Sequence, residues 1–155
     1  MSIIVTNFEL SKVMQRDFDA VIGMLDTTQQ HSWFPDHPNR KMWFFSDVIS
    51  GQDAPTARQI SEIINHFRKS GLHAPDKKTL IHCAAGISRS PAVAIGLKID
   101  GGMNAQNAFE DTFKQRPQMW PNELILKHFD DIFGADGELL EFDRKWKIKQ
   151  HKLQW

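Results

Sequence analysis

Short apolar runs alternate with longer amphipathic runs along this chain, and no other feature of the sequence restricts the fold as strongly. The short runs have the length and composition of buried strands, whereas the longer runs repeat apolar residues with the period of a helix. Such alternation is typical of α/β domains with a parallel sheet. A chain of 155 residues is long enough for one such domain to bury its own core. The strand candidates are residues 3–5, 20–25, 42–45 and 79–82.

We therefore predict a single α/β domain with a small central, mostly parallel sheet of four to five strands flanked by helices. The run at 56–71 predicts a helix, because its apolar residues share one stripe and Gly71 follows as a stop. Asp53 is expected to cap the start of this helix, with Pro55 in the first turn. A helical C-terminal half is expected, with helices at residues 91–99, 104–115 and 122–133.

The last residues, 143–155, form a basic tail that carries two tryptophans. We assign residues 1–142 to the folded domain and residues 143–155 to this tail. A helix or strand that docks Trp146 and Trp155 on the domain explains the pattern better than a charged arm that recruits a partner.

Charge and cysteine content exclude several classes of function. The chain has 19 Lys and Arg against 19 Asp and Glu, so its overall charge favours neither a nucleic-acid coat nor a membrane-surface protein. Its single cysteine excludes an internal disulfide and any site built from several thiolates. The first residues lack the pattern of a secretory leader, and no apolar segment is long enough to span a bilayer. We therefore expect a cytoplasmic protein whose partners are neither membranes nor nucleic acids.

The single cysteine, Cys83, lies where the predicted strand 79–82 passes into the next helix, in the stretch TLIHCAAGISRSPAVAIG. A loop at this position opens at the carboxyl end of the sheet, where α/β proteins bind ligands. Ser90 suits the N-cap of the next helix, and Pro91 suits its first position. The backbone N–H groups of the loop would then surround one anion in front of the helix N-terminus. These groups belong to Ala84, Ala85, Gly86, Ile87 and Ser88.

Arg89 completes this predicted anion site. Its planar guanidinium can hold two oxygens of a phosphoryl group, and together with the loop amides it favours the thiolate form of Cys83, which is a nucleophile. Cys83 could instead be a small buried side chain at a strand end, a common position for free cysteines. Average residue usage puts the chance of this spacing of His, Cys, Arg and Ser at on the order of one in ten thousand. The functional interpretation is therefore favoured.

The stretch HCAAGISRS resembles the His-Cys-x5-Arg-Ser/Thr motif of cysteine-dependent protein tyrosine phosphatases, and its Ala-Gly-Ile-Ser-Arg-Ser core is most similar to the dual-specificity branch. A second segment, FKQRPQMWPNELILKHFDDIFG, resembles the part of that branch that follows the active site. The likeness runs in element order from residue 42 to Gly134, and it is greatest to small bacterial-type members. The matching positions in the second segment are Arg116, Pro117, Pro121 and Asn122.

The resemblance implies a phosphatase domain at residues 1–142 that works in two steps, without a metal or another cofactor. Cys83 attacks phosphorus to give a phosphocysteine while Arg89 binds the phosphate, and an aspartic acid protonates the leaving oxygen. The same aspartate then activates the water that releases phosphate. By the same resemblance, Ser90 hydrogen-bonds the sulfur, His82 fixes the loop, and residues 84–89 bind the phosphate.

Three aspartates upstream of Cys83 are candidates for the general acid. Asp47 directly follows the predicted strand 42–45, so a parallel sheet brings it to the same edge as the Cys83 loop. The dual-specificity branch also keeps its acid just after this strand. Asp53 stays open as the alternative, although its expected capping role explains it without catalysis. Asp36 lies in WFPDHP, which resembles the acid loop of the larger tyrosine phosphatases, but it precedes the strand and is the least favoured.

The resemblance implies a phosphorylated protein or a small phosphomonoester as substrate, with phosphotyrosine, phosphoserine and phosphothreonine all open. The loop contains no lysine, which ranks inositol phosphates lower. Three alternatives use the same anion loop: a phospho-binding module that does not hydrolyse, an RNA 5′-triphosphatase and a sulfurtransferase. The histidines show no pair at metal-ligand spacing, so no metal site is expected. The sequence predicts no oligomeric state.

Overall fold

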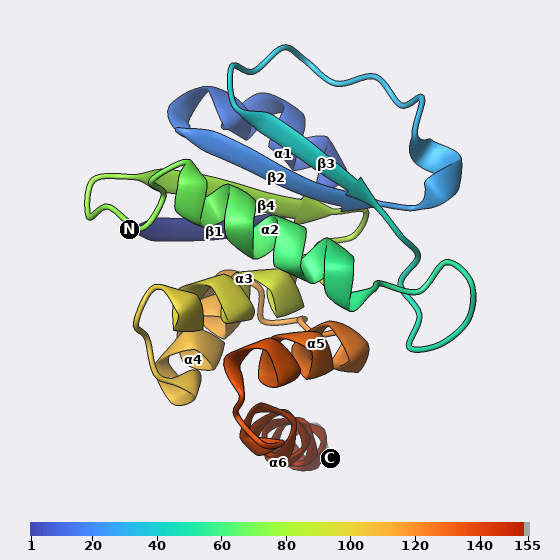
Figure 1. Ribbon diagram of the computed structural model, residues 1–155, viewed down its shortest axis with the longest axis vertical. Coiled ribbons are helices and arrows are strands. Elements are labelled where there is room, and N and C mark those ends of the chain that lie inside the picture. Colours follow the sequence, from blue (N-terminus) through green and yellow to red (C-terminus); the bar gives the residue numbers. More distant parts are fainter. Residues whose placement is uncertain (154–155) are drawn as a thin grey trace.

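A four-stranded parallel sheet forms the centre of the computed structural model, which describes residues 1–153 (Figure 1). The strands stand in the order β1-β4-β2-β3, and each neighbouring pair is parallel. All four carboxyl ends therefore lie at one edge of the sheet, where the loops that follow them meet. The predicted fold class is confirmed. The strands are β1 Ser2–Asn7, β2 Ala20–Leu25, β3 Arg40–Phe44 and β4 Lys78–Cys83.

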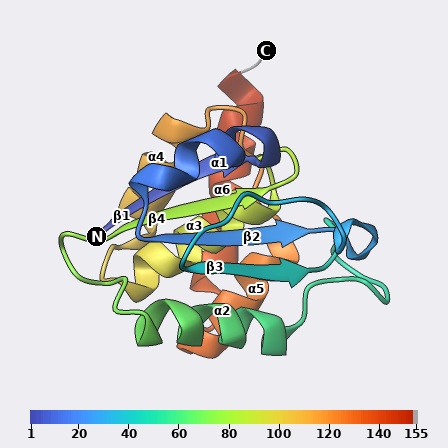
Figure 2. The same ribbon diagram turned by 90° about the horizontal axis from the view of Figure 1, so that it is seen from above.

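The helices are divided unequally between the two sides of the sheet. One helix, α1, lies on one side, whereas α2 to α6 lie on the other (Figures 1 and 2). There α3 packs on the sheet, α4 and α5 pack on α3, and α6 packs on α5. The main core forms between the sheet and these helices. The helices are α1 Phe8–Met14, α2 Ala57–Lys69, α3 Arg89–Asp100, α4 Ala105–Gln115, α5 Glu123–Phe133 and α6 Glu138–Leu153, with short 3-10 helices at Gln15–Asp17 and Thr27–Gln29.

The outer edge of β1 is closed by a side chain. Gln115, the last residue of α4, accepts a hydrogen bond from the Val5 N–H at 2.9 Å and donates one to the Ile3 carbonyl at 3.0 Å. A side-chain amide thus takes the hydrogen-bonding positions that a neighbouring strand would occupy. The sheet therefore ends at β1.

The helix predicted at 56–71 is α2, and its apolar stripe is buried as expected, but its predicted cap is wrong. Thr56 is the N-cap: its hydroxyl accepts from the Gln59 N–H at 3.2 Å, and the Gln59 side chain accepts from the Thr56 N–H at 3.0 Å. This reciprocal capping box needs a hydroxyl on the residue directly before the helix, which is Thr56. Asp53 and Pro55 lie further upstream, so Asp53 cannot be the cap. The Asp53 carbonyl instead accepts from the Ser46 N–H at 2.7 Å and closes the loop after β3. The buried stripe is Ile60, Ile63, Ile64 and Phe67.

The predicted start of α3 is also wrong. Ser88 rather than Ser90 is the N-cap, and its side chain makes no capping hydrogen bond. Both hydroxyls have other partners, since Ser88 Oγ donates to Asp47 at 2.7 Å and Ser90 Oγ lies 3.2 Å from the sulfur of Cys83. Pro91 falls at the third helical position, which costs no hydrogen bond because the N–H groups of a first turn have no partner within the helix.

The C-terminal half is helical, as predicted. Asn104 and Asn122 cap α4 and α5, and Gly134 ends α5 with a φ of 65°. α6 is continuous from Glu138 to Leu153, so the proposed division at residue 142 falls inside one helix, and as a division of function it stays a prediction. None of the helices in residues 1–153 combines the length and the apolar character needed to cross a bilayer.

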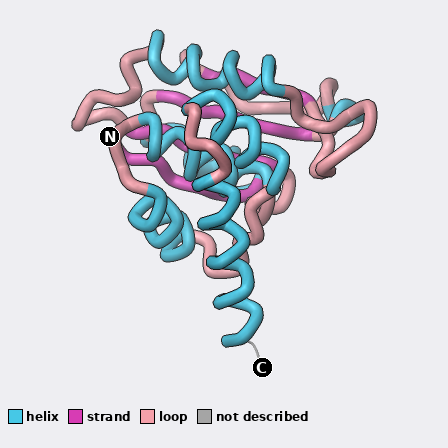
Figure 3. Tube along the Cα trace, turned by 60° about the horizontal axis from the view of Figure 1, so that its bottom comes forward, coloured by secondary structure: helices cyan, strands magenta, loops and turns pink. Residues whose placement is uncertain are grey.

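Trp146 on α6 docks on the body of the domain. The centroid of its ring lies 5.7 Å from that of Phe109 and 5.6 Å from that of Phe113, both on α4. The packed interpretation is therefore confirmed for Trp146, whereas Trp155 lies outside the described residues. Beyond these contacts, the C-terminal end of α6 extends away from the rest of the fold (Figure 3).

Candidate active site

The Cys83 loop joins β4 to α3 at the carboxyl edge of the sheet. Cys83 is only 2% exposed, and its sulfur accepts a hydrogen bond from the Gly86 N–H at 3.2 Å. The hydroxyl oxygen of Ser90 lies 3.2 Å from the same sulfur. The sulfur therefore faces polar groups of its own loop and of the first turn of α3.

The backbone of this loop is turned so that its carbonyl groups point outward. Each carbonyl of residues 84–88 accepts a hydrogen bond from a residue outside the loop. Peptide planes whose oxygens are held outside direct their N–H groups inward, toward a possible anion. The N–H groups of Ala85, Ile87 and Ser88 make no hydrogen bond within residues 1–153. The outside donors are the backbone N–H groups of Phe8, Trp120 and Asn122 and the side chain of Arg116.

Arg116 clamps this loop from the end of α4. Its Nε donates to the Gly86 carbonyl and its Nη2 to the Ala85 carbonyl, each at 2.9 Å. The sequence marks Arg116 only as one matching position of the second segment and predicts no role for it. Gly86 has a φ of +69°, and a Cβ there would lie 2.8 Å from the Thr6 carbonyl. Glycine is thus required both by the backbone conformation and by the close approach of β1.

Arg89 lies beneath the loop with its side chain only 6% exposed. Nη1 donates to the carboxylate of Asp26 and to the Phe45 carbonyl, each at 2.8 Å. Nε is buried without a hydrogen-bond partner, and no hydrogen bond from Nη2 is found within residues 1–153, so the edge of the guanidinium formed by these two atoms makes no hydrogen bond to the protein. Two parallel N–H groups on one such edge match two oxygens of a phosphoryl group.

Of the three candidate aspartates, only Asp47 is hydrogen-bonded to the Cys83 loop within residues 1–153; Asp53 and Asp36 are not. Asp47 Oδ1 accepts from Ser88 Oγ at 2.7 Å and from Asn122 Nδ2 at 2.9 Å. Asp53 is exposed in the same loop after β3, and the structure records no side-chain contact for it. The Asp36 carbonyl accepts from Gln15 at 3.3 Å, on a segment that runs back toward the start of β3.

Asp26 is a site residue that the sequence reasoning missed. It directly follows β2 and forms an ion pair with Arg89. The signal that selected Asp47, a carboxylate just after a strand of a parallel sheet, applies equally to Asp26 and could have found it.

His82 is fully buried beneath the Cys83 loop, and its ring stacks on Phe8 with centroids 5.8 Å apart. Burial lowers the pKa of His82 to about 4, so the imidazole is neutral at pH 7. Within residues 1–153, the structure contains no group of three or more His, Cys, Asp and Glu side chains that could hold a metal ion.

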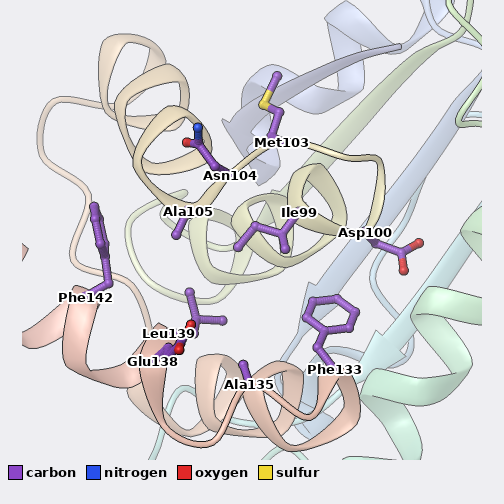
Figure 4. A pocket seen from close by; sticks show the side chains of 10 residues that line it. All are labelled: Ile99, Asp100, Met103, Asn104, Ala105, Phe133, Ala135, Glu138, Leu139 and Phe142. Atoms are coloured by element: carbon purple, nitrogen blue, oxygen red, sulfur yellow. The ribbon is translucent and has the colours of Figure 1, made fainter.

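A cavity of about 530 Å³ lies at the opposite end of α3, and it holds none of the predicted site residues (Figure 4). Its walls are mostly apolar, and the carboxylate of Asp100 on its rim is already paired with Arg68 and His73. The groups capable of chemistry are therefore at the other end of this helix. The cavity is lined by Ile99, Asp100, Met103, Asn104, Ala105, Phe133, Ala135, Glu138, Leu139 and Phe142.

Comparison with known proteins gave relatives in sequence and in structure, although no family model matches the chain. Tyrosine-protein phosphatase vhp-1 from Caenorhabditis elegans is 35% identical over 140 residues, which is 90% of this chain and 19% of that protein. Human dual specificity protein phosphatase 8 is 33% identical over 72 residues, or 46% of this chain and 10% of that protein. The chain thus spans only a small part of either relative.

Solved structures share the fold at low sequence identity. Human DUSP28 has a TM-score of 0.64 and 15% identity, covering 86% of this chain and 94% of that one. The PTP-2 phosphatase of Cydia pomonella has a TM-score of 0.61 and 21% identity, covering 84% of this chain and 85% of that one. Most of the chain therefore shares its fold with these proteins.

Proposed function

The chain belongs to the cysteine-dependent protein tyrosine phosphatase superfamily and resembles its dual-specificity members, and from this we propose that it hydrolyses phosphate monoesters through a phosphocysteine on Cys83. The observation that carries the proposal is the Cys83 loop, where inward N–H groups, the sulfur and the free edge of Arg89 surround one site. A phosphoryl dianion has the charge and the oxygens that these donors require. The likeness to bacterial-type members stays a prediction.

In the first step, the thiolate of Cys83 attacks phosphorus, and the bond from phosphorus to the leaving oxygen breaks. The loop N–H groups and the Nε and Nη2 groups of Arg89 hold the remaining phosphoryl oxygens while charge develops on them. Asp47 donates its proton to the leaving oxygen, so that an alcohol or phenol departs. The products are a phosphocysteine and an ionised Asp47.

In the second step, water attacks the phosphocysteine and Asp47 takes its proton. The bond from sulfur to phosphorus breaks, which restores the thiolate and frees inorganic phosphate. The hydroxyl of Ser90, 3.2 Å from the sulfur, donates a hydrogen bond to it as it leaves.

We assign the acid to Asp47 because its carboxylate is joined to the anion loop itself. Ser88 of that loop and Asn122 both bond Oδ1, and Oδ2 is left to face the leaving group. Asp53 is the alternative, since it lies exposed in the same loop after β3.

We propose phosphorylated protein side chains as the substrates. Ile87, Val48 and Trp120 stand around the Cys83 loop and are 36%, 39% and 45% exposed. An apolar rim of this kind packs against the stem of a phosphotyrosine or phosphothreonine, and it adds no positive charge for a polyphosphate or an inositol phosphate. The names of the relatives, tyrosine-protein phosphatase and dual specificity protein phosphatase, agree with this substrate class.

The test is phosphate release by the intact chain from p-nitrophenyl phosphate and from phosphotyrosine and phosphothreonine peptides, with no added metal. We expect turnover that vanadate inhibits, and loss of turnover in Cys83→Ser without a change in the thermal melting temperature. Tight binding of a phosphopeptide without any turnover by the intact chain would instead show a phospho-binding module.

A further inference from the structure

We propose that Asp26 is a positioning residue that orients Arg89 for the phosphoryl group, an inference that rests on the proposed phosphatase function. Asp26 Oδ1 lies 2.8 Å from Nη1 of Arg89, and the ion pair joins the end of β2 to the start of α3. The two residues are far apart in the sequence, and neither the motif nor the expected mechanism includes Asp26.

The hydrogen atoms of the Arg89 guanidinium show what Asp26 does. A guanidinium carries one N–H on Nε and two on each Nη. Nη1 gives one hydrogen to Asp26 and the other to the Phe45 carbonyl, each at 2.8 Å, so both are used. The N–H groups of Nε and Nη2 have no protein partner within residues 1–153. Protein groups thus hold one end of the guanidinium, and the opposite edge is left to bind two phosphoryl oxygens.

Two acceptors are needed to define the plane of the guanidinium. With the Phe45 carbonyl as its single acceptor, the guanidinium could pivot about Nη1. A second acceptor, on the residue that follows the neighbouring strand β2, removes this freedom. The backbone of Asp26 is itself fixed by Gln29, because the Asp26 N–H donates to Gln29 Oε1 at 3.1 Å and the Gln29 N–H donates to the Asp26 carbonyl at 2.8 Å. Orientation therefore passes from Gln29 through Asp26 to Arg89.

The negative charge of Asp26 also repels phosphate, so the two effects must be weighed. The side chain of Asp26 is 42% exposed, and water screens its repulsion, whereas that of Arg89 is only 6% exposed. Without Asp26, the buried guanidinium of Arg89 can move, and its positive charge loses the negative charge that balances it. Positioning therefore outweighs repulsion, and removal of Asp26 weakens phosphate binding.

The experiment compares Asp26→Ala and Asp26→Asn with the intact chain. Asn keeps an oxygen acceptor at the position of Oδ1, whereas Ala removes it. We expect Asp26→Ala to weaken the binding of inorganic phosphate about 10-fold in calorimetry and to lower kcat/KM about 10²-fold. The loss should be equal for p-nitrophenyl phosphate and phenyl phosphate, because proton donation is not affected. Asp26→Asn should restore both values to within about 3-fold.

A second readout separates positioning from general destabilisation. Iodoacetate reaches Cys83 as an anion that Arg89 can bind, whereas iodoacetamide is neutral. The ratio of the two alkylation rates should fall about 10-fold in Asp26→Ala and stay unchanged in the control Asp76→Ala, an exposed aspartate before β4 at the opposite edge of the sheet. A lower melting temperature with an unchanged ratio would mean a purely structural role.

Several outcomes overturn the inference. Phosphate binding as tight in Asp26→Ala as in the intact chain would show that repulsion dominates or that Arg89 needs no second anchor. A loss confined to phenyl phosphate, the poorer leaving group, would make Asp26 a proton donor instead. If the intact chain releases no phosphate at all, the proposed function fails, yet calorimetry and alkylation still decide whether Asp26 orients Arg89.

Discussion

The Cys83 loop and the loop of residues 46–53 follow two strands of the same sheet, but they are held in different ways. Every carbonyl of residues 84–88 is bonded from outside, and Cys83 and Arg89 are buried. By contrast, residues 47–53 are exposed, and within the described residues 1–153 the Asp47 carboxylate accepts hydrogen bonds only from Ser88 and Asn122. The difference teaches that the proposed phosphate-binding loop is held from outside along its whole length, whereas the proposed acid lies on an exposed loop with fewer bonds to the body.

The substitution Asp47→Asn is expected to have the largest effect among those that test the comparison of the two loops. We expect kcat on phenyl phosphate to fall by about 10²–10⁴, because the leaving oxygen no longer receives a proton. The affinity for inorganic phosphate should stay within about 3-fold, because Asn keeps an oxygen that can accept from Ser88 and the carbonyls of the Cys83 loop are bonded by other residues. Steady-state kinetics and calorimetry measure the two quantities. A near-normal rate here, together with a large loss in Asp53→Asn, would transfer the role to Asp53.

The second effect concerns the buried histidine beneath the Cys83 loop. The pKa of His82 is lowered from 6.5 to about 4 by burial, so the unfolded chain binds a proton that the folded chain does not. The contribution of His82 to stability is therefore complete above pH 6.5. As the pH drops to 4, the free energy of unfolding should fall by about 3 kcal/mol, roughly a 10²-fold change in the folding equilibrium.

Urea denaturation of the intact chain and of His82→Gln at pH 7, 5.5 and 4 measures this effect of acid. The difference in stability between the two proteins isolates His82, because the other titrating groups are common to both. An equal loss of stability in both proteins would contradict the expectation.

The third effect compares glycines of the two loops. Gly86→Ala places a Cβ 2.8 Å from the Thr6 carbonyl at a φ of +69°, whereas Gly51→Ala has a φ of +102° but no atom within 4 Å of its Cβ. We expect Gly86→Ala to cost about 1–3 kcal/mol and to weaken phosphate binding, and Gly51→Ala to leave phosphate binding unchanged. Thermal melts and calorimetry test the pair. Equal effects at the two positions would remove the distinction between the loops.

The smallest effect is expected for Asp53→Asn. The side chain of Asp53 is exposed and is not the cap of α2. We therefore expect kcat to change by less than about 3-fold and the melting temperature by less than about 2 °C. The same kinetic assays decide this. A drop of more than about 10²-fold would show that the exposed loop delivers Asp53 to the leaving group.

The sequence predicts best those features whose cause is local. The strands, the buried stripe of α2 and the Cys83 loop follow from residue type and spacing alone. The caps of α2 and α3 were mispredicted because the choice among nearby polar groups depends on tertiary partners, such as Asp47 for Ser88. The role of Arg116 depends on which chain segment the fold brings to the Cys83 loop, and no local pattern encodes that. The position of Asp26 just after β2 places it at the same edge of the sheet, but its pairing with Arg89 is a tertiary contact.

The side chain of Gln115 also protects the outer edge of β1 from other molecules. An open strand edge is a template on which a second molecule can add a strand, and this is a route to aggregation. The Gln115 amide already bonds the Val5 N–H and the Ile3 carbonyl at this edge. An incoming strand must break both bonds before it can form its own, so this edge is a poorer template for strand addition than an open one.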